Sequence, residues 1–474
     1  MKSTAVPGVD FARVGGWIER YFERPDAYRV APAVEPGDVV RALPASAPEN
    51  AETFDEIMSD FERIIVAGST LWNHPRFFAY FATSAAPAAV AAEALAATLD
   101  VKAMLWRTSP AATELEEVVM RWLGGLLGLP RDWTGIIYDT ASIAGFTALA
   151  AARESMGFEI REAGMAGRDL PALRVYVTDE THSHVEKAAI ALGIGQRNVV
   201  RIPCDGAFRM NARGLRDAVE RDGGAGLRPM AIVATVGTTS TTSIDPLREI
   251  AEIARAYDIW LHVDAAYAGV AAILPECRHM FDGIEAADSL VVNPHKWMFV
   301  PMDCSALFVK DASLLRRTFG LVPEYLTTPQ DDAVNYMDYG LQLGRRFRSL
   351  KLWFVLRHLG AEGIRAQLRR HIALAREFAS WVQATPDWEV LAPHPFSVVC
   401  FRYAPSGLDD AELERLNSGI MDAVNATGEV FISHTKVAGK YAIRLAIGNI
   451  RTERSDVEAA WHLLRRAAVE ARPS

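Results

Sequence analysis

Short apolar runs rich in β-branched residues alternate with amphipathic stretches from about residue 87 onward. Short β-branched runs are typical of strands and amphipathic stretches of helices, so the alternation predicts an α/β fold with helices on both faces of a sheet. The expected strands are residues 135–138, 174–177, 199–202, 231–235, 259–263 and 289–292. The helices expected between several of them are residues 143–153, 185–192 and 247–257. Strands joined through helices run parallel, so a mostly parallel sheet follows.

The two ends of the chain have different patterns. Residues 1–86 carry prolines around short amphipathic stretches such as 54–66. Such an arm must pack on the rest of its own chain or on a second copy of the chain, and we expect the second copy. The elements expected after residue 350 are helices at 351–358 and 361–382, strands near 398–403, 430–433 and 442–446, and a last helix at 453–471. The predicted parts are thus an arm (1–86), a large domain (87–350) and a small C-terminal α/β domain (351–474).

Charge and cysteine usage narrow the possible ligands. The 474 residues include 59 acidic and 50 basic side chains, a net charge of −9 without a long block of either sign. This argues against a nucleic-acid or membrane surface and favours a small molecule. The four cysteines have no paired spacing that would suggest a metal site or redox couple. Without a signal-like start or a membrane-length apolar run, the chain is expected to be cytoplasmic.

Two segments carry the most informative chemistry. The predicted strand 259–263 leads directly into Asp264, at the strand end where open α/β sheets bind ligands, although a lone aspartate there can equally cap a turn. The strand 289–292 leads to Lys296, between His295 and Trp297, where burial lowers the pKa of an amine and makes it nucleophilic. Together, an amine and an acid meet two requirements of pyridoxal 5′-phosphate: one binds the aldehyde and the other keeps the ring nitrogen protonated.

Two further segments fit the same cofactor. Residues 138–142, between a strand and a helix, offer hydroxyls, backbone N–H groups and a helix N-terminus to a phosphate, although Thr140 or Ser142 can also be an ordinary N-cap. His182 follows another strand and can stack on the cofactor ring. The nearby His184 raises the alternative of a metal site, but no further cluster of metal-type ligands accompanies the two histidines, so no metal is expected.

The chain resembles the group II pyridoxal-phosphate decarboxylases, and among them the aromatic L-amino acid decarboxylases. The resemblance runs from about His74 almost to the C-terminus. The segments that carry it are 74–81 (HPRFFAYF), 109–116 (SPAATELE), 237–239 (GTT), 262–269 (HVDAAYAG), 293–297 (NPHKW) and 344–351 (GRRFRSLK). It implies a fold type I homodimer with a large domain built on a mostly parallel seven-stranded sheet, an arm that wraps the partner, and active sites at the subunit interface.

Carried over position by position, the resemblance implies a role for each site residue. Lys296 forms the Schiff base with the cofactor, Asp264 pairs with its ring nitrogen and His182 stacks on its ring. The residues implied to hold the phosphate are Ala141, Ser142, Asn293 and His295, and those implied to line the rest of the cofactor site are Thr239 and Ala266. The family's catalytic loop maps to residues 321–329 and makes Tyr325 the proton donor, although without the resemblance this segment is more typical of a surface loop.

The phosphate segment departs from the family's pattern. Residues 138–143 read Tyr-Asp-Thr-Ala-Ser-Ile, where relatives usually have Gln-Gly first and an acid after the serine. The departure places an additional carboxylate, Asp139, near the expected phosphate. Either Asp139 points away from the phosphate, or the phosphate contacts differ from those of the family.

The expected substrate pocket is large and mostly apolar, which suits an aromatic side chain better than glutamate. Its expected residues are Trp72, Tyr80, Phe81, Thr83 and Met302, with Met104 and Leu105 from the second subunit and Gly344 at a position where glycine in plant relatives accompanies indole substrates. The resemblance thus implies decarboxylation of phenylalanine, tyrosine, dopa or tryptophan to the arylalkylamine and CO₂. Tyr325 then protonates Cα, directly or through His182.

Three alternatives stand beside this prediction. An aromatic aldehyde synthase uses the same scaffold, but relatives of that type commonly lack the loop tyrosine or the stacking histidine, whereas this chain has Tyr325 and His182. A catalytically silent homologue is disfavoured because every residue that the chemistry requires is present. An aminotransferase or carbon–sulfur lyase is compatible with the Asp–Lys pair, and only the surrounding segments argue for decarboxylation.

Overall fold

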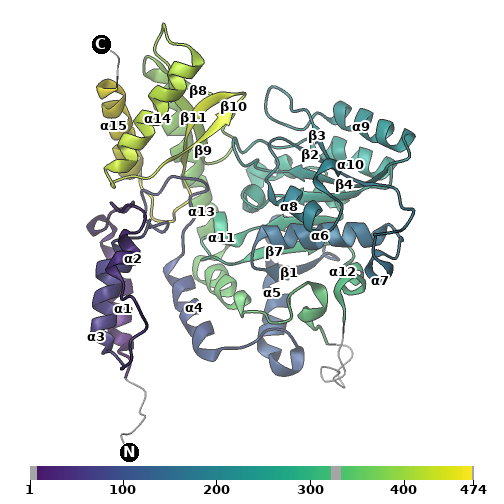
Figure 1. Ribbon diagram of the computed structural model, residues 1–474, viewed down its shortest axis with the longest axis horizontal. Coiled ribbons are helices and arrows are strands. Elements are labelled where there is room, and N and C mark those ends of the chain that lie inside the picture. The colour runs from purple at the N-terminus through teal and green to yellow at the C-terminus, as the bar shows by residue number, and fades with distance from the viewer. Residues whose placement is uncertain (1–7, 322–332, 472–474) are drawn as a thin grey trace, which may run out of the picture.

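The computed structural model describes residues 8–321 and 333–471, and a seven-stranded sheet lies at the centre of its larger part (Figure 1). The strands are β1 (Thr134–Tyr138), β2 (Leu173–Thr178), β3 (Val199–Ile202), β4 (Arg228–Thr235), β5 (Trp260–Asp264), β6 (Ser289–Val292) and β7 (Ser305–Val309). Their order is β1-β7-β6-β5-β4-β2-β3. Neighbours from β3 to β6 pair in parallel, and β7 pairs antiparallel with β6 and β1. The predicted mostly parallel seven-stranded sheet is confirmed.

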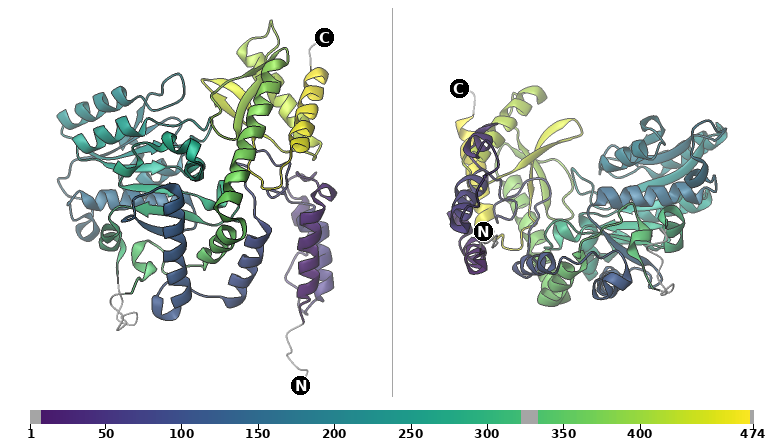
Figure 2. Two further views of the ribbon diagram at one scale, coloured as in Figure 1. Left: turned by 180° about the vertical axis from the view of Figure 1, so that it is seen from behind. Right: turned by 60° about the horizontal axis from the view of Figure 1, so that its bottom comes forward.

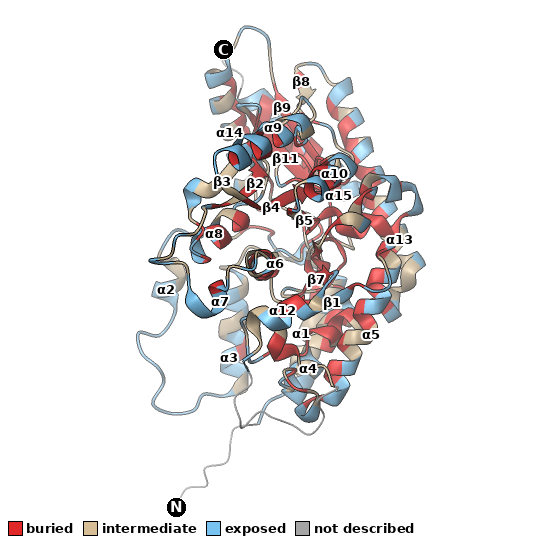
Figure 3. Ribbon diagram, turned by 90° about the vertical axis from the view of Figure 1, so that its right-hand side faces the viewer, coloured by how far each residue is buried: buried red, intermediate tan, exposed pale blue. Residues whose placement is uncertain are grey.

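Helices cover both faces of this sheet, because successive strand residues point to opposite sides and both sides are apolar. One layer contains α6 (Ala141–Ser155), α8 (His184–Ala191) and α12 (Ala312–Phe319), and the other contains α5 (Pro110–Leu127), α9 (Ala212–Gly224) and α10 (Leu247–Ala256). In β1, for example, Ile136 joins the core beneath α6 and Ile137 the core beneath α5. The central strands are therefore buried (Figure 3). The remaining helices of this part are α4 (Pro87–Leu99), α7 (Ile160–Ala163) and α11 (Pro294–Trp297).

The carboxyl ends of six strands, β1 to β6, lie at one edge of the sheet. β1 and β6 both pair antiparallel with β7, so β1 points the same way as the parallel strands. The segments that follow β1, β2, β4, β5 and β6 at this edge contribute residues to one cavity. All residues predicted to bind the cofactor lie at these strand ends or directly after them, which brings them to one place.

A second, antiparallel sheet lies beyond residue 350. Its strands are β8 (Trp388–Val390), β9 (Val398–Tyr403), β10 (Ser433–Val437) and β11 (Lys440–Ala446), in the order β10-β11-β9-β8. Its helices are α13 (Arg348–Ala384), α14 (Asp410–Ala426) and α15 (Arg454–Glu470), which share an apolar core with the sheet. α13 crosses the predicted domain boundary at residue 350 and bends at Gly360, whose φ of 63° interrupts the helix. The three-part division stays a prediction.

The N-terminal arm lies beside the small sheet. It contains α1 (Phe11–Glu23), α2 (Asp38–Ala42) and α3 (Phe54–Asp60), which continues as a π-helix, Phe61–Val66. Both views in Figure 2 show the arm helices apart from the large domain. The N–H of Val30 donates to the carbonyl of Gly428 at 2.8 Å, which ties the arm to the small domain. Among the described residues, no helix is both long and apolar enough to cross a membrane.

Three strands differ from the prediction: β7 and the three-residue β8 are not predicted, and β10 lies at other residues. β7 is not predicted, because only the four-residue helix α11 separates it from β6, too short to continue the strand–helix alternation. The strand predicted at 430–433 instead begins at Ser433 and runs to Val437. β10 is an edge strand with exposed side chains, so its polar sequence lacks the apolar pattern on which the prediction depended.

Candidate active site

A cavity of about 150 Å³ lies at the carboxyl ends of the central strands. Its wall contains every residue predicted to bind the cofactor: Ala141, Ser142, His182, Thr239, Asp264, Ala266, Asn293, His295 and Lys296. The wall also contains residues that the cofactor prediction did not include: Phe81, Thr140, His184, Thr235, Gly237 and Tyr267. Tertiary structure thus assembles the predicted set in one cavity.

Lys296 lies on α11, the short helix that follows β6. Burial lowers the pKa of Lys296 below its ordinary value, and the carboxylate of Asp264 offsets part of this shift. Nζ lies 4.8 Å from the centroid of the Phe81 ring, a cation–π contact. A lowered pKa increases the fraction of uncharged amine, which is the form that attacks an aldehyde.

Asp264 is the last residue of β5 and is 4% exposed. Burial by itself raises the pKa of a carboxyl, but His184, Lys296 and the N–H of Ala266, which donates to Oδ1 at 3.0 Å, hold the pKa of Asp264 below its ordinary value. Asp264 therefore carries a negative charge at neutral pH. A buried anion at this point is what a protonated ring nitrogen needs as its partner.

Two imidazoles lie side by side on the cavity wall. Nδ1 of His182 is 3.1 Å from Nδ1 of His184 and also accepts the backbone N–H of His184 at 3.2 Å. Burial lowers the pKa of His182, and His184 and Lys296 lower it further. Residues 8–321 and 333–471 contain no group of three metal-type side chains that could hold an ion.

The N-terminus of α6 forms another part of the wall. The first N–H groups of a helix have no acceptor within it and favour an anion. Thr140 precedes the helix without a side-chain hydrogen bond to it, so the structure does not support Thr140 as an ordinary N-cap. The backbone at Ala141 and Ser142 is therefore suited to a phosphate.

Two polar side chains each keep a donor for the cavity. Nδ1 of His295 accepts the N–H of Cys304 at 2.9 Å, which leaves the ring proton on Nε2. Burial lowers the pKa of His295 to about 3, with a further contribution from Lys296, so the ring is neutral. Oδ1 of Asn293 accepts the hydroxyl of Ser305 at 2.6 Å, which leaves its amide NH₂ to donate elsewhere.

One buried hydroxyl on the cavity wall fits a site for a polar molecule. Oγ1 of Thr235, on the cavity wall, has no hydrogen-bond partner among the described residues. A buried polar atom without a partner is costly, and a bound polar molecule would satisfy it. The amine, the anion, the helix N-terminus and the neutral donors together fit pyridoxal 5′-phosphate.

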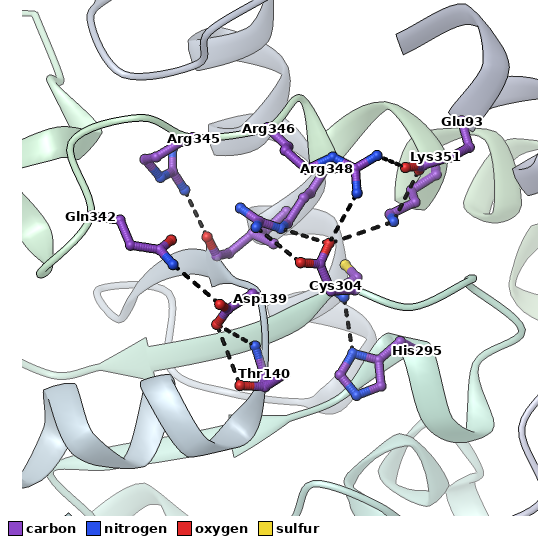
Figure 4. A network of polar contacts seen from close by, with 12 residues as sticks. Glu93, Asp139, Thr140, His295, Cys304, Gln342, Arg345, Arg346, Arg348 and Lys351 are labelled. Atoms are coloured by element: carbon purple, nitrogen blue, oxygen red, sulfur yellow. Dashed lines mark hydrogen bonds and ion pairs between the residues drawn. The ribbon is translucent and has the colours of Figure 1, made fainter. Parts of the chain in front are cut away.

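Asp139 does not line the cavity. Its Oδ1 accepts the N–H of Thr140 at 2.6 Å, and its Oδ2 accepts Nε2 of Gln342 at 3.1 Å (Figure 4). The carboxylate is thus turned toward the segment that precedes α13. Of the two arrangements that the sequence leaves open, the structure has the one in which Asp139 points away from the phosphate site.

The residues predicted to bind substrate are only partly assembled. Phe81 lines the cavity and stacks on Tyr267 with 4.1 Å between ring centroids. Trp72 and Tyr80 stack on each other at 5.4 Å, about half exposed, outside the cavity wall. The others that do not line this cavity are Thr83, Met104, Leu105, Met302 and Gly344. Tyr325, the predicted proton donor, lies outside the described residues.

Gly344 lies in a different pocket. That pocket, of about 320 Å³, is formed between α4 and the segment that leads into α13. Met302 is also far from enclosed, with 68% of its surface exposed. A single chain therefore does not bring these two residues to the Lys296 cavity.

Arg444 is a residue of this region that the sequence does not reveal. It lies on β11 and donates to the carbonyls of Tyr80 at 2.9 Å, Thr239 at 2.9 Å and Ser240 at 3.0 Å. It is 4% exposed, burial lowers its pKa, and no carboxylate of the described residues forms an ion pair with it. A single arginine within a strand gives no local signal of function. Only the fold shows that its Cζ lies 5.4 Å from the centroid of the Phe81 ring.

Comparisons with known proteins show which family the chain belongs to. The pyridoxal-dependent decarboxylase conserved domain matches residues 36–404. Tryptophan decarboxylase 2 of Oryza sativa subsp. japonica is 40% identical over 469 residues, 97% of this chain and 93% of the relative. A phenylacetaldehyde synthase of Arabidopsis thaliana is 40% identical over 463 residues, 95% of this chain and 94% of the relative.

Solved structures show the same likeness. The crystal structure of Catharanthus roseus tryptophan decarboxylase in complex with L-tryptophan superposes with a TM-score of 0.91 at 38% identity, covering 97% of each chain. The matched domain, the identity of the relatives and the shared fold all point to one family. The chain belongs to the pyridoxal-dependent decarboxylases.

Proposed function

We propose that the chain decarboxylates an aromatic L-amino acid, releasing the arylalkylamine and CO₂. The observation that carries this proposal is the buried Lys296–Asp264 pair beside the stacked rings of Phe81 and Tyr267. The pair fits the cofactor, and the rings fit an aromatic substrate better than an acidic one. The tryptophan decarboxylase relatives support the same substrate class.

Each residue of the cavity has a separate task. Bound pyridoxal phosphate supplies an electron-accepting ring for the pair of electrons left when CO₂ departs. Lys296 holds the aldehyde carbon, and the anionic Asp264 keeps the ring nitrogen protonated. The groups proposed to hold the phosphate are the backbone N–H groups and hydroxyl of Ala141 and Ser142, the amide of Asn293 and Nε2–H of His295.

We infer that Arg444 attracts the α-carboxylate of the substrate. Its guanidinium has five N–H donors, and the three carbonyls of Tyr80, Thr239 and Ser240 do not neutralise its charge. A buried cation without an anionic partner among the described residues favours an incoming carboxylate. The ring of Phe81, 4.8 Å from Nζ of Lys296 and 5.4 Å from Cζ of Arg444, then contacts the substrate's apolar part.

We propose that the active enzyme is a homodimer. Leu95 and Leu99 of α4 are 50% and 62% exposed, and Leu341 and Leu343 lie similarly exposed before α13. Both pairs precede or interrupt, along the chain, the residues that line the pocket containing Gly344, and exposed apolar residues of this size favour a protein partner over water. A second copy on this surface accounts for the incomplete substrate pocket, because Met104 and Gly344 are then available to its cavity. Leu105 is 4% exposed and packs on Met337 of its own chain, so its predicted contact needs a local rearrangement.

Tyr325 is the proposed proton donor to Cα, with His182 as an alternative or a relay. Whether Cα is protonated decides between an amine and an aldehyde product. The phenylacetaldehyde synthase among the relatives is named for an aldehyde product, so both products are considered for this fold. A well-placed donor favours clean amine formation. We therefore expect amine as the main product of the wild-type chain.

The test is a product assay with phenylalanine, tyrosine, dopa, tryptophan and glutamate as separate substrates. Amine and CO₂ in equal amounts from an aromatic substrate, with Lys296→Ala as an inactive blank, are the expected result. Stoichiometric peroxide and ammonia would instead establish the aldehyde synthase. Tyr325→Phe should release CO₂ but gain aldehyde and peroxide, and unchanged clean amine formation would remove Tyr325 from its role.

A further inference from the structure

His184 lies next to two residues of the site, and the only roles assigned to it above are its contributions to the lowered pKa values of His182 and Asp264. Its side chain is 3% exposed and lies on the cavity wall. Its Nδ1 is 3.1 Å from Nδ1 of His182 and 4.0 Å from Oδ2 of Asp264. The imidazole thus touches the ring expected to stack on the cofactor and faces the carboxylate expected to pair with it.

The hydrogen bonds around His182 fix where its proton can be. The backbone N–H of His184 can only donate, and it donates to Nδ1 of His182 at 3.2 Å. Nδ1 of His182 is therefore an acceptor, so the 3.1 Å contact requires Nδ1 of His184 to carry a hydrogen. Two donors converge on one nitrogen of His182, which leaves Nε2 as the only place for its ring proton.

The other side of the His184 ring depends on a glycine. Nε2 of His184 is buried and has no hydrogen-bond partner among the described residues. A Cβ at Gly145, on α6, would lie 2.6 Å from this Nε2 and 2.8 Å from Cδ2. Helix α6 thus makes room for the imidazole only because position 145 has no side chain.

We propose that His184 is a positioning residue, seated against Gly145, that holds His182 as a neutral imidazole with its proton on Nε2. A cationic His182 needs a second hydrogen at Nδ1, where it would meet the N–H of the backbone and the Nδ1–H of His184. The other charged groups that act on His182 are Lys296 and Lys187, which also oppose a cation, and Asp264, which favours one. His184 itself stays neutral because burial lowers its pKa.

The consequence for catalysis rests on the proposed function. A ring with its proton fixed on Nε2 can donate or relay that proton from one defined atom, and a neutral ring stacks on the cofactor without adding a positive charge. The tautomer itself does not depend on the reaction and is measured directly. Failure of the decarboxylation assay and failure of this inference are therefore separate results.

The test uses the full-length holoenzyme labelled with ¹³Cε1,¹⁵N-histidine, with the signals of His182 assigned by their loss in His182→Ala. In the wild type we expect Nε2-protonated shifts and a neutral ring down to acidic pH. His184→Ala removes one of the two donors, so the titration midpoint of His182 should rise by about one pH unit. His184→Asn can place an amide N–H near the same point and should restore most of the wild-type midpoint.

Gly145→Ala provides an independent test, because alanine is favourable within a helix and acts here only by displacing the imidazole. It should shift the midpoint of His182 as His184→Ala does, and the double variant should shift it no further. Gly419→Ala, a helical glycine with nothing near its added Cβ, is the matched control and should leave the midpoint unchanged. A wild-type His182 protonated on Nδ1, or an unshifted midpoint in both Gly145→Ala and His184→Ala, overturns the proposal.

Discussion

At the scale of single residues, one substitution tests the charge of Asp264 without changing the size of its side chain. Asp264→Asn keeps the size of the side chain and can still accept the Ala266 N–H, but it cannot pair with a cationic ring nitrogen. We expect kcat to fall on the order of 10²-fold or more, because fixed charges in buried sites contribute strongly to catalysis. Steady-state assays of amine release measure this loss, with cofactor absorbance as a control for loading. Near-normal kcat in a fully loaded variant would contradict the role of Asp264.

Buried histidines make the fold sensitive to acid. Burial lowers the pKa of His262 to about 4 and of His371 to about 3. The unfolded chain protonates both near pH 6.5 while the folded chain keeps them neutral, so the free energy of unfolding falls as the pH drops below about 6.5. His371→Gln should reduce this fall by roughly 2 kcal/mol between pH 7 and pH 5.

Urea unfolding followed by tryptophan fluorescence at both pH values, at one protein concentration, measures this difference. Glutamine at 371 can accept from Nε1 of Trp297 and donate to the carbonyl of Asn449, as His371 does at 3.0 Å each. The exposed His462, replaced by glutamine, is the control and should not alter the pH dependence. If wild type and His371→Gln lose equal stability between the two pH values, His371 does not titrate as inferred.

At the scale of elements, the turn after β4 places Thr239 on the cavity wall. Gly237 begins this turn with a φ of 88°, and a Cβ on it would lie 2.5 Å from Cβ of Ala268. Gly237→Ala therefore combines backbone strain with a clash, and we expect it to destabilise the protein by about 1–3 kcal/mol and to weaken cofactor binding.

Gly157→Ala separates the two causes, because Gly157 has a φ of 71° but nothing within 4 Å of its added Cβ. This control should show the backbone cost alone, about 1 kcal/mol, with normal cofactor affinity. Thermal unfolding and titration of the apoprotein with pyridoxal phosphate measure both quantities. Equal effects of the two variants would show that the Ala268 contact is unimportant.

At the scale of the whole molecule, the proposed dimer links stability to activity. Leu95→Glu with Leu99→Glu places two charges on the exposed apolar side of α4, where they cannot enter an apolar interface without a large cost. We expect a monomer by size-exclusion chromatography with light scattering and loss of most amine formation, since the substrate pocket then lacks its second half. Val469→Glu, 73% exposed on α15, is the matched control and should stay dimeric and active. A dimeric, active double variant would place the interface elsewhere.

The sequence by itself determined the parts that depend on neighbouring residues. Short apolar runs predicted six strands of the large sheet, because a strand buried on both faces must be apolar throughout. The order of strand, acid and lysine predicted Asp264 and Lys296, and the structure brings both to one cavity. Each of these features is encoded within a few residues of one segment.

Only the tertiary structure decided which distant groups meet. Asp139 turns to Gln342, 203 positions away, and no local rule predicts that hydrogen bond. Arg444 reaches the site from the small sheet. The imidazole of His184 fits because Gly145, on another helix, has no side chain. The physical reason is that the hydrophobic effect has no direction. A pattern of apolar residues therefore indicates which side chains are buried but not which residues they contact. The direction of a carboxylate, the tautomer of an imidazole and the placement of a buried cation depend on contacts that exist only once the chain has folded.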